Sequence, residues 1–292
     1  MNSKLRIYPG HIFAALLILA LVVMDRSIDD WGRLSNGFDN FVGFFHEQLW
    51  PPDWSVLDPR VYPECTASKN LDFTCSTAWI GMVETLQIAF VSTMFAMTIS
   101  LPMALLAARN VGTVQTAFVT RFLLAAFRSL PALIWAIFFV ILIGLGAISG
   151  IFAMTIYSVG YLGKLQYEAI EGMNSLPLEA ADAAGLSRFE KALHVVIPES
   201  ANDLISQAIF MFEYNVRHGS VIGIVGAGGI GYYIDRSLFF LAYDEVLAYL
   251  IIVFVAVITI DIISACARSF FNDDRNAVRK PSWKSVFIPG YE

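Results

Sequence analysis

One uncharged stretch, Ser129 to Gly163, decides the fold class: SLPALIWAIFFVILIGLGAISGIFAMTIYSVGYLG contains no Asp, Glu, Lys or Arg. A single helix of this length would extend about 52 Å, whereas the hydrocarbon core of a bilayer is about 30 Å thick. The stretch therefore predicts two membrane spans that fold back on each other. Three glycines, Gly144, Gly146 and Gly150, predict the turn, because glycine weakens helical continuity.

The composition of the whole chain supports this interpretation. Of the 292 residues, 57% are hydrophobic and 15% are charged, against about 25% charged in an ordinary soluble domain. A formal net charge of -6 argues against nucleic-acid binding, which normally requires a basic surface. Three cysteines are too few for a disulfide scaffold. We therefore predict an all-α polytopic membrane protein.

Further apolar runs bring the prediction to about six transmembrane helices. The first run is short enough to be a signal peptide, but it leads directly into Asp25-Arg26 without a small-residue cleavage site, so we interpret it as an uncleaved span. The additional spans are Ile12–Met24, Ile80–Ala108, Leu204–Val225 and Glu245–Ala267.

Basic residues predict the orientation of these spans. The 25–78 segment holds four basic and nine acidic residues, whereas the tail from Arg268 holds five basic residues. Because cytoplasmic loops are enriched in Lys and Arg, both termini are expected in the cytoplasm and 25–78 outside it. Cys65 and Cys75 would then lie in an oxidising compartment and could form a structural disulfide. The alternative is a pair of free thiols in a reduced loop.

A polar stretch between the fourth and fifth spans, residues 171–203, carries signals for two short helices. Asn174 or Ser175 can cap the first helix, and Gly185 is a suitable stop for it. Ser187 and Glu190 form a capping box for the second helix, and Pro198 is expected to end it. Such a compact element could dock into another protein, although an ordinary loop would have a similar composition.

The spacing within this stretch resembles the EAA loop of ABC importer permeases. Glu179-Ala180-Ala181 is followed after three residues by Gly185 and after nine more by Val195-Val196-Ile197-Pro198, where Val195 and Ile197 replace Ile and Leu. The resemblance implies that loop 171–203 is the coupling element that docks into a cytoplasmic ATPase. The implied ATPase-coupling residues are Glu179, Ala180, Ala181, Gly185, Ser187 and Pro198.

A narrower resemblance, over most of residues 80–268, is to permease subunits of phosphonate and phosphite ABC importers. Its most particular motif is Phe212-Glu213-Tyr214-Asn215-Val216-Arg217, while the glycine-rich 225–231 segment is shared with other importer permeases. The resemblance implies the type I fold of the methionine importer. It also implies a layout of 1–24 as cytoplasmic N-terminus and first span, 25–78 as extracytoplasmic segment, 79–268 as core permease domain and 269–292 as cytoplasmic tail.

The polar cluster in the predicted fifth span leaves two interpretations open. Glu213 and Arg217 are four residues apart and could pair along one helical face. Charged groups inside a span are costly and face a partner or a watery path. Glu213, Asn215, Arg217 and His218 could thus line a translocation path for a phosphorus oxyanion, or Glu213 and Arg217 could lock helix packing. Arg121 and Arg128 are interpreted as snorkelling cations, and Asp261 receives no role.

Motifs for catalysis are absent from the sequence. Gly226-x-Gly228-x-x-Gly231 matches a dinucleotide pattern, but it lies between two predicted spans without a βαβ unit, so a tight turn or close helix packing is favoured. No Gly-x4-Gly-Lys-Ser/Thr and no metal-ligand pattern occur. We therefore predict a transporter subunit, not an enzyme, with no cofactor or metal of its own.

The resemblance also implies partners and a location. ATP and Mg²⁺ would be bound by two copies of a partner ATPase, and an extracytoplasmic phosphonate-binding protein would deliver the substrate. A second permease copy, identical or paralogous, would complete the pore in the bacterial inner membrane. The chain would contact the lipid bilayer and would bind no nucleic acid. One alternative is a permease of this architecture for methionine or a sulfonate. Another is a membrane-embedded enzyme or respiratory subunit, which would need paired His ligands, whereas the four His lie in unrelated places.

Overall fold

The computed structural model describes residues 9–28, 32–60 and 73–272, and within these ranges all regular secondary structure is helical. The chain forms two compact units, residues 1–51 and 52–292. The first unit contains α1 (Pro9–Ser27), α2 (Gly32–Phe44) and the short η1 (Phe45–Leu49). Cys65, the N-terminal residues 1–8 and the tail from 273 lie outside the described residues. Cys75 is disulfide-bonded, and its pairing with Cys65 stays a prediction.

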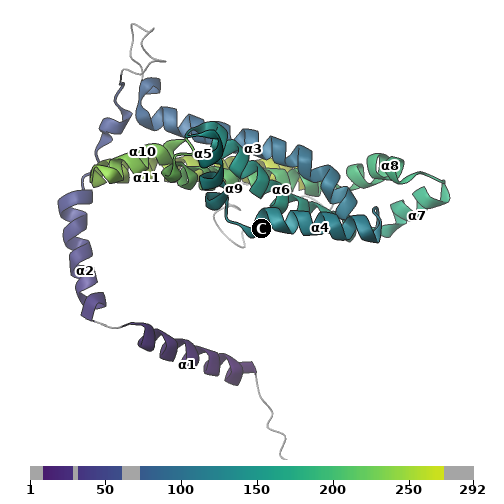
Figure 1. The fold of residues 1–292 in the computed structure, drawn as a ribbon, viewed down its shortest axis with the longest axis horizontal. Coiled ribbons are helices and arrows are strands. Elements are labelled where there is room, and N and C mark those ends of the chain that lie inside the picture. The colour runs from purple at the N-terminus through teal and green to yellow at the C-terminus, as the bar shows by residue number, and fades with distance from the viewer. Residues whose placement is uncertain (1–8, 29–31, 61–72, 273–292) are drawn as a thin grey trace, which may run out of the picture. The chain divides into compact units, whose positions relative to one another are not determined.

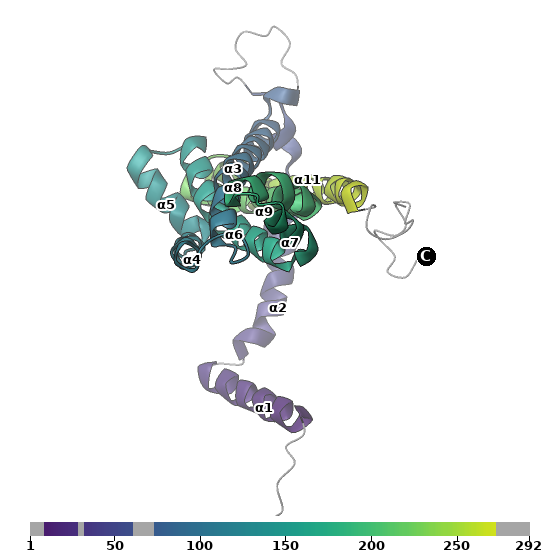
Figure 2. The same ribbon diagram turned by 90° about the vertical axis from the view of Figure 1, so that its right-hand side faces the viewer.

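The second unit is a helical bundle (Figure 1). The long helices α3, α6, α9 and α11 run lengthwise and pack against one another, while α7 and α8 lie at one end. Figure 2 shows α5 to one side of α6. The elements are η2 (Trp54–Leu57), η3 (Phe73–Cys75), α3 (Thr77–Ala107), α4 (Val114–Ser129), α5 (Ala132–Ile143), α6 (Ala147–Gly172), α7 (Ser175–Ala183), α8 (Arg188–Lys191), η4 (Ala192–Val196), α9 (Ile197–Ile222), η5 (Gly223–Val225), α10 (Ile230–Phe239) and α11 (Tyr243–Asn272).

Small residues let the central helices approach closely. On α6, a Cβ added to Gly160 would lie 2.8 Å from the carbonyl oxygen of Leu124 on α4, and one added to Gly163 would meet the Leu124 side chain at 2.5 Å. On α3, Ala89, Ala96 and other alanines are fully buried. Because lipid tails are as apolar as Leu, membrane helices associate through such close packing instead of a hydrophobic driving force.

Among the described residues, three helices are long and apolar enough to cross a membrane: Thr77–Ala107, Ala147–Gly172 and Tyr243–Ser269. A fourth crossing results if α4 and α5, which meet at 83°, are counted as one bent span. The remaining predicted spans, 12–24 and 204–225, coincide with α1 and α9. The all-α polytopic fold class is confirmed, and the helix count roughly fits the predicted six.

The 129–163 stretch folds back as predicted, but its first half does not form a full span. Gly144 and Gly146 adopt positive φ angles of 113° and 126° at the turn. However, α5 has only 12 residues, about 18 Å of helix at 1.5 Å per residue. The reason is Pro131, which holds Leu130 in an extended conformation (φ -100°, ψ 137°) and separates α5 from α4.

The glycine-rich segment between α9 and α10 forms a tight turn and also allows close packing, the two roles that the sequence suggested. Gly226, Gly228 and Gly229 have φ angles of 75–82°, which form a tight turn. Gly223 and Gly231 pack backbone to backbone, because a Cβ on Gly223 would lie 2.6 Å from the Cα of Gly231. The Gly146 amide donates to the Gly226 carbonyl (2.9 Å), so this turn also holds the α5–α6 turn.

Candidate functional site

The charged residues of α9 pair with α11 and not with each other. Arg217 and Asp261 form an ion pair at 2.5 Å. Glu213, only 5% exposed, lies 2.8 Å from the guanidinium of Arg268, close enough for an ion pair although the angles do not make a hydrogen bond. The predicted Glu213–Arg217 pair is therefore wrong. The physical reason is that α11 lies along α9 and presents an opposite charge to each residue.

Asn215 joins three helices inside the bundle. Its side chain is 1% exposed, its Nδ2 donates to Thr93 Oγ1 on α3 (2.9 Å), and its Oδ1 accepts from Ser158 Oγ on α6 (3.1 Å). A buried amide with both ends satisfied rigidifies its surroundings. Asn215 therefore packs α9 against α3 and α6, and its place on a translocation path stays a prediction.

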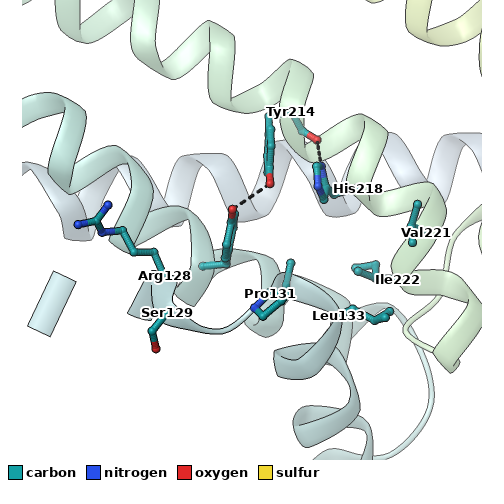
Figure 3. Close-up of a pocket in the computed structure, with 10 residues that line it drawn as sticks. Arg128, Ser129, Pro131, Leu133, Tyr214, His218, Val221 and Ile222 are labelled. Atoms are coloured by element: carbon teal, nitrogen blue, oxygen red, sulfur yellow. Dashed lines mark hydrogen bonds between the residues drawn. The ribbon is translucent and has the colours of Figure 1, made fainter. Parts of the chain in front are cut away.

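His218 lines a cavity of about 260 Å³ between the end of α4, α6 and α9 (Figure 3). Its Nδ1 lies 3.0 Å from the Tyr214 carbonyl oxygen, and its ring stacks on the Tyr214 ring at a centroid distance of 3.8 Å. The hydroxyl groups of Tyr214 and Tyr157 are hydrogen-bonded to each other at 2.9 Å. Of the four predicted path residues, only His218 reaches this cavity.

Arg128 lies at the rim of the same cavity, and sequence reasoning missed this role. In Figure 3, Tyr214 and His218 lie on α9, and Arg128 extends from the end of α4, with its guanidinium directed away from them. Within the described part of the chain, Arg128 has no ion pair, and its buried Nε has no hydrogen-bond partner. Arg121, the other presumed snorkelling cation, instead binds Glu171 and the Ala107 carbonyl. The sequence feature that could have indicated this position is Pro131, which turns the chain shortly after Arg128.

The local structure of residues 171–203 follows the predicted capping signals. Asn174 caps α7 by accepting from the Leu176 amide (3.1 Å), and Gly185 ends it with φ +75°. Ser187 and Glu190 form the reciprocal capping box of α8. Hydrogen bonds from Ser187 to the carboxylate hold the pKa of Glu190 below its usual value.

Pro198 does not close the second helix, which corrects the prediction. Helix α8, η4 and α9 follow one another without a break, and Pro198 lies in the first turn of α9. Proline is tolerated there because the π-helical turn η4 directly before it locally rearranges the helical hydrogen bonds. The segment is fixed to the bundle at its start, where Glu171 accepts from the Arg109 amide (2.7 Å) and pairs with Arg121.

The surface of this segment exposes both a carboxylate and apolar side chains. Glu179, Ala180 and Gly185 are exposed, whereas Ala181 is buried. The side chains of Leu176 and Phe189 are 66% and 76% exposed. Large exposed apolar side chains beside polar groups are typical of a protein-binding surface.

We expect the Arg217–Asp261 pair to stabilise the α9–α11 contact as a unit. Asp261→Asn or Arg217→Gln alone leaves one charge uncompensated inside a predicted span, at about 2–3 kcal/mol, so each should lower the thermal stability of the purified permease. The double variant should recover most of that loss, as measured by fluorescence-detected thermal unfolding. If the loss of thermal stability in the double variant equals the sum of the losses in the two single variants, the two residues do not interact and the pairing is contradicted.

Comparison with known proteins agrees with this architecture. Residues 100–274 match the family model "Binding-protein-dependent transport system inner membrane component". The phosphite transport system permease protein PtxC of Stutzerimonas stutzeri is 40% identical over 202 residues, which are 68% of this chain and 74% of that protein. The phosphate-import permease protein PhnE of Mycolicibacterium smegmatis is 34% identical over 201 residues, which are 68% of this chain and 38% of that protein.

Solved structures share the fold. An inward-facing structure of the MetNI methionine ABC transporter superposes with a TM-score of 0.61 at 20% identity, covering 72% of this chain and 99% of the MetNI chain. The methionine-importer-like fold expected from the sequence is thereby confirmed. Because the family model covers more than half of the sequence, the chain belongs to the family of inner membrane components of binding-protein-dependent transport systems.

Proposed function

We propose that this chain is the membrane-spanning subunit of an ATP-driven importer for phosphite or phosphonate anions. The observation that carries the proposal is the 40% identity to a phosphite permease over 202 residues. A cavity lined by Arg128 and by no carboxylate side chain is compatible with an anionic substrate. The similarity to a methionine transporter, at 20% identity, concerns the fold and does not favour methionine as the substrate.

The energy for transport would come from other subunits. No P-loop motif occurs in the sequence, so ATP and Mg²⁺ would be bound by two copies of a cytoplasmic ABC ATPase. An extracytoplasmic binding protein would deliver the anion, and a second permease, either the same chain or a paralogue, would complete the path across the bacterial inner membrane. Both termini would be cytoplasmic, and residues 25–78, with a Cys65–Cys75 disulfide, would face the binding protein.

The 171–203 segment would couple ATP hydrolysis to the membrane helices. Its proposed contacts with the ATPase are made by Glu179, Ala180 and the turn at Gly185, which are exposed, with Phe189 as an additional apolar anchor. Three other residues would shape the segment without touching the ATPase. Ala181 is buried, Ser187 caps α8, and Pro198 lies in the first turn of α9. The anchoring of Glu171 to Arg121 would transmit movement of the segment to α4.

The substrate class is tested by reconstitution. The permease is purified with its cognate ATPase and binding protein, incorporated into liposomes and supplied with ATP. We expect ATP-dependent uptake of phosphite or a simple alkylphosphonate, with inorganic phosphate, methionine and an alkylsulfonate as comparison substrates. Uptake of methionine or the sulfonate without uptake of any phosphorus oxyanion would overturn the proposal.

A further inference from the structure

A stripe of partly exposed polar aromatic side chains runs along α6 and α9. Tyr157 and Tyr161 on α6 and Tyr214 and His218 on α9 are each partly exposed. Their rings are nearly parallel: Tyr214 makes interplanar angles of 12° with Tyr157, 13° with Tyr161 and 20° with His218. By contrast, α4 and α5 expose apolar side chains such as Phe118, Phe122 and Ile141.

Hydrocarbon cannot satisfy the polar atoms of this stripe. Helix α6 is long and apolar enough to span a membrane, so the donors and acceptors of the hydroxyl and imidazole groups that are not used within the stripe would find no partner in lipid. Polar side chains within membrane spans face a protein surface or a water-filled path. The apolar faces of α4 and α5 suit contact with lipid, whereas the stripe does not.

We infer that the stripe is a wall of the anion path, and that Arg128, the Tyr157–Tyr214 pair and His218 form an anion subsite at one end of it. This inference rests on the proposed function and assigns its substrate contacts to particular side chains. The cavity of about 260 Å³ accommodates a small tetrahedral oxyanion with part of its hydration shell, since one liquid water occupies about 30 Å³.

The hydrogen bonds within the subsite determine which donor and acceptor atoms remain for a ligand. The Tyr214 carbonyl can only accept, so the Nδ1 of His218 carries a proton, and Nε2 is then the acceptor of the neutral imidazole. When the imidazole is neutral, Nε2 accepts the proton of a P–OH group. Within the Tyr157–Tyr214 pair one hydroxyl donates to the other, so the accepting hydroxyl keeps its own proton for a ligand.

Charge completes the recognition of an oxyanion. Arg128 supplies a permanent positive charge and a planar set of donors that suits phosphorus oxyanions. Among the described residues that line the cavity there is no Asp or Glu that would pair with Arg128 in place of the ligand. Arg217, which sequence reasoning favoured for this role, is already neutralised by Asp261.

The test compares Arg128→Gln and Arg128→Lys with the paired variant R217Q/D261N in the reconstituted transporter. The paired variant also removes one arginine from the membrane region but leaves no lone charge, so it is a matched control. For Arg128→Gln we expect at least about a tenfold fall in the rate of phosphite uptake at saturating phosphite and binding protein. Arg128→Lys should be affected less, and the control should resemble wild type. His218→Phe should also lower this rate, because it removes the Nε2 acceptor.

A second measurement does not depend on transport. Ser129 lines the same cavity, and the thiol introduced by Ser129→Cys can be alkylated with a small reagent while the native Cys266 on α11, which is exposed, serves as internal control. Phosphite should slow alkylation at position 129 and leave Cys266 unchanged.

The outcomes separate the two proposals. Absence of phosphite and phosphonate uptake by wild type would remove the proposed function. Two results would overturn the subsite alone. One is normal wild-type uptake together with an unchanged uptake rate, at saturating phosphite and binding protein, in Arg128→Gln and His218→Phe. The other is an alkylation rate of the Ser129→Cys variant that saturating phosphite does not change.

Discussion

Replacement of Gly231 by alanine is expected to prevent accumulation of folded permease. A Cβ at this position would collide with the carbonyl oxygen of Ser220 and lie 2.8 Å from the Cα of Gly223. Both neighbours are backbone atoms of the α9–η5 region, so neither can move aside by a rotamer change. We expect a loss of at least about 3 kcal/mol, the upper part of the usual range for overpacking, which is a large share of a typical total stability of about 5–15 kcal/mol.

Gly172→Ala is the matched control, because a Cβ there has no neighbour within 4 Å. Both variants are expressed with a fluorescent fusion and analysed by size-exclusion chromatography in detergent. Gly231→Ala should lose the monodisperse peak, whereas Gly172→Ala should keep it. Wild-type yield and thermal stability of Gly231→Ala would contradict the close backbone packing of Gly223 with Gly231.

Substitutions in the proposed coupling segment are expected to abolish transport without damaging the membrane fold. Gly185→Val places a β-branched residue at φ +75°, which L side chains rarely adopt, so the turn between α7 and α8 must change. A Cβ at Gly185 meets nothing within 4 Å, so the bundle itself is not perturbed. Glu179→Lys reverses an exposed charge on α7.

The measurement for both variants is capture of the cognate ATPase by the purified permease, followed by uptake. We expect at least about a tenfold loss in ATPase affinity, equivalent to ~1.4 kcal/mol, with unchanged permease yield. Asp235→Lys is the control for charge reversal, since Asp235 is exposed on α10, at the other end of the bundle from α7. ATPase capture by Glu179→Lys and Gly185→Val equal to that of wild type would exclude the segment from coupling.

Properties that depend on local sequence were predicted well. The caps at Asn174 and Ser187, the stop at Gly185 and the turn at Gly144–Gly146 all formed as expected. Each depends on a few neighbouring residues, whose hydrogen bonds and φ preferences act over one helical turn. The membrane character was predictable for a similar reason, because a run of uncharged residues is itself the requirement for crossing lipid.

Pairings between distant residues were not predictable from one sequence. Spacing within α9 indicated a Glu213–Arg217 pair, but the actual partners, Arg268 and Asp261, lie on α11. An i,i+4 pair on a helix surface contributes only about 0.2–0.5 kcal/mol, which is small against the cost of leaving Asp261 or Arg268 unpaired within the membrane region. The choice therefore depends on which helices pack together.

The sequence by itself determined the fold class and the glycine turns, because the absence of charge and the conformational freedom of glycine are properties of single segments. Only the tertiary structure decided which cation is available to an anion. Arg217 and Arg128 are both arginines near predicted spans, but Arg217 pairs with Asp261, whereas Arg128 lines the same cavity as Tyr157 and His218 and has no carboxylate partner among the described residues. A side chain's charge comes from the sequence, but whether that charge is neutralised depends on helices that the chain brings together from far apart.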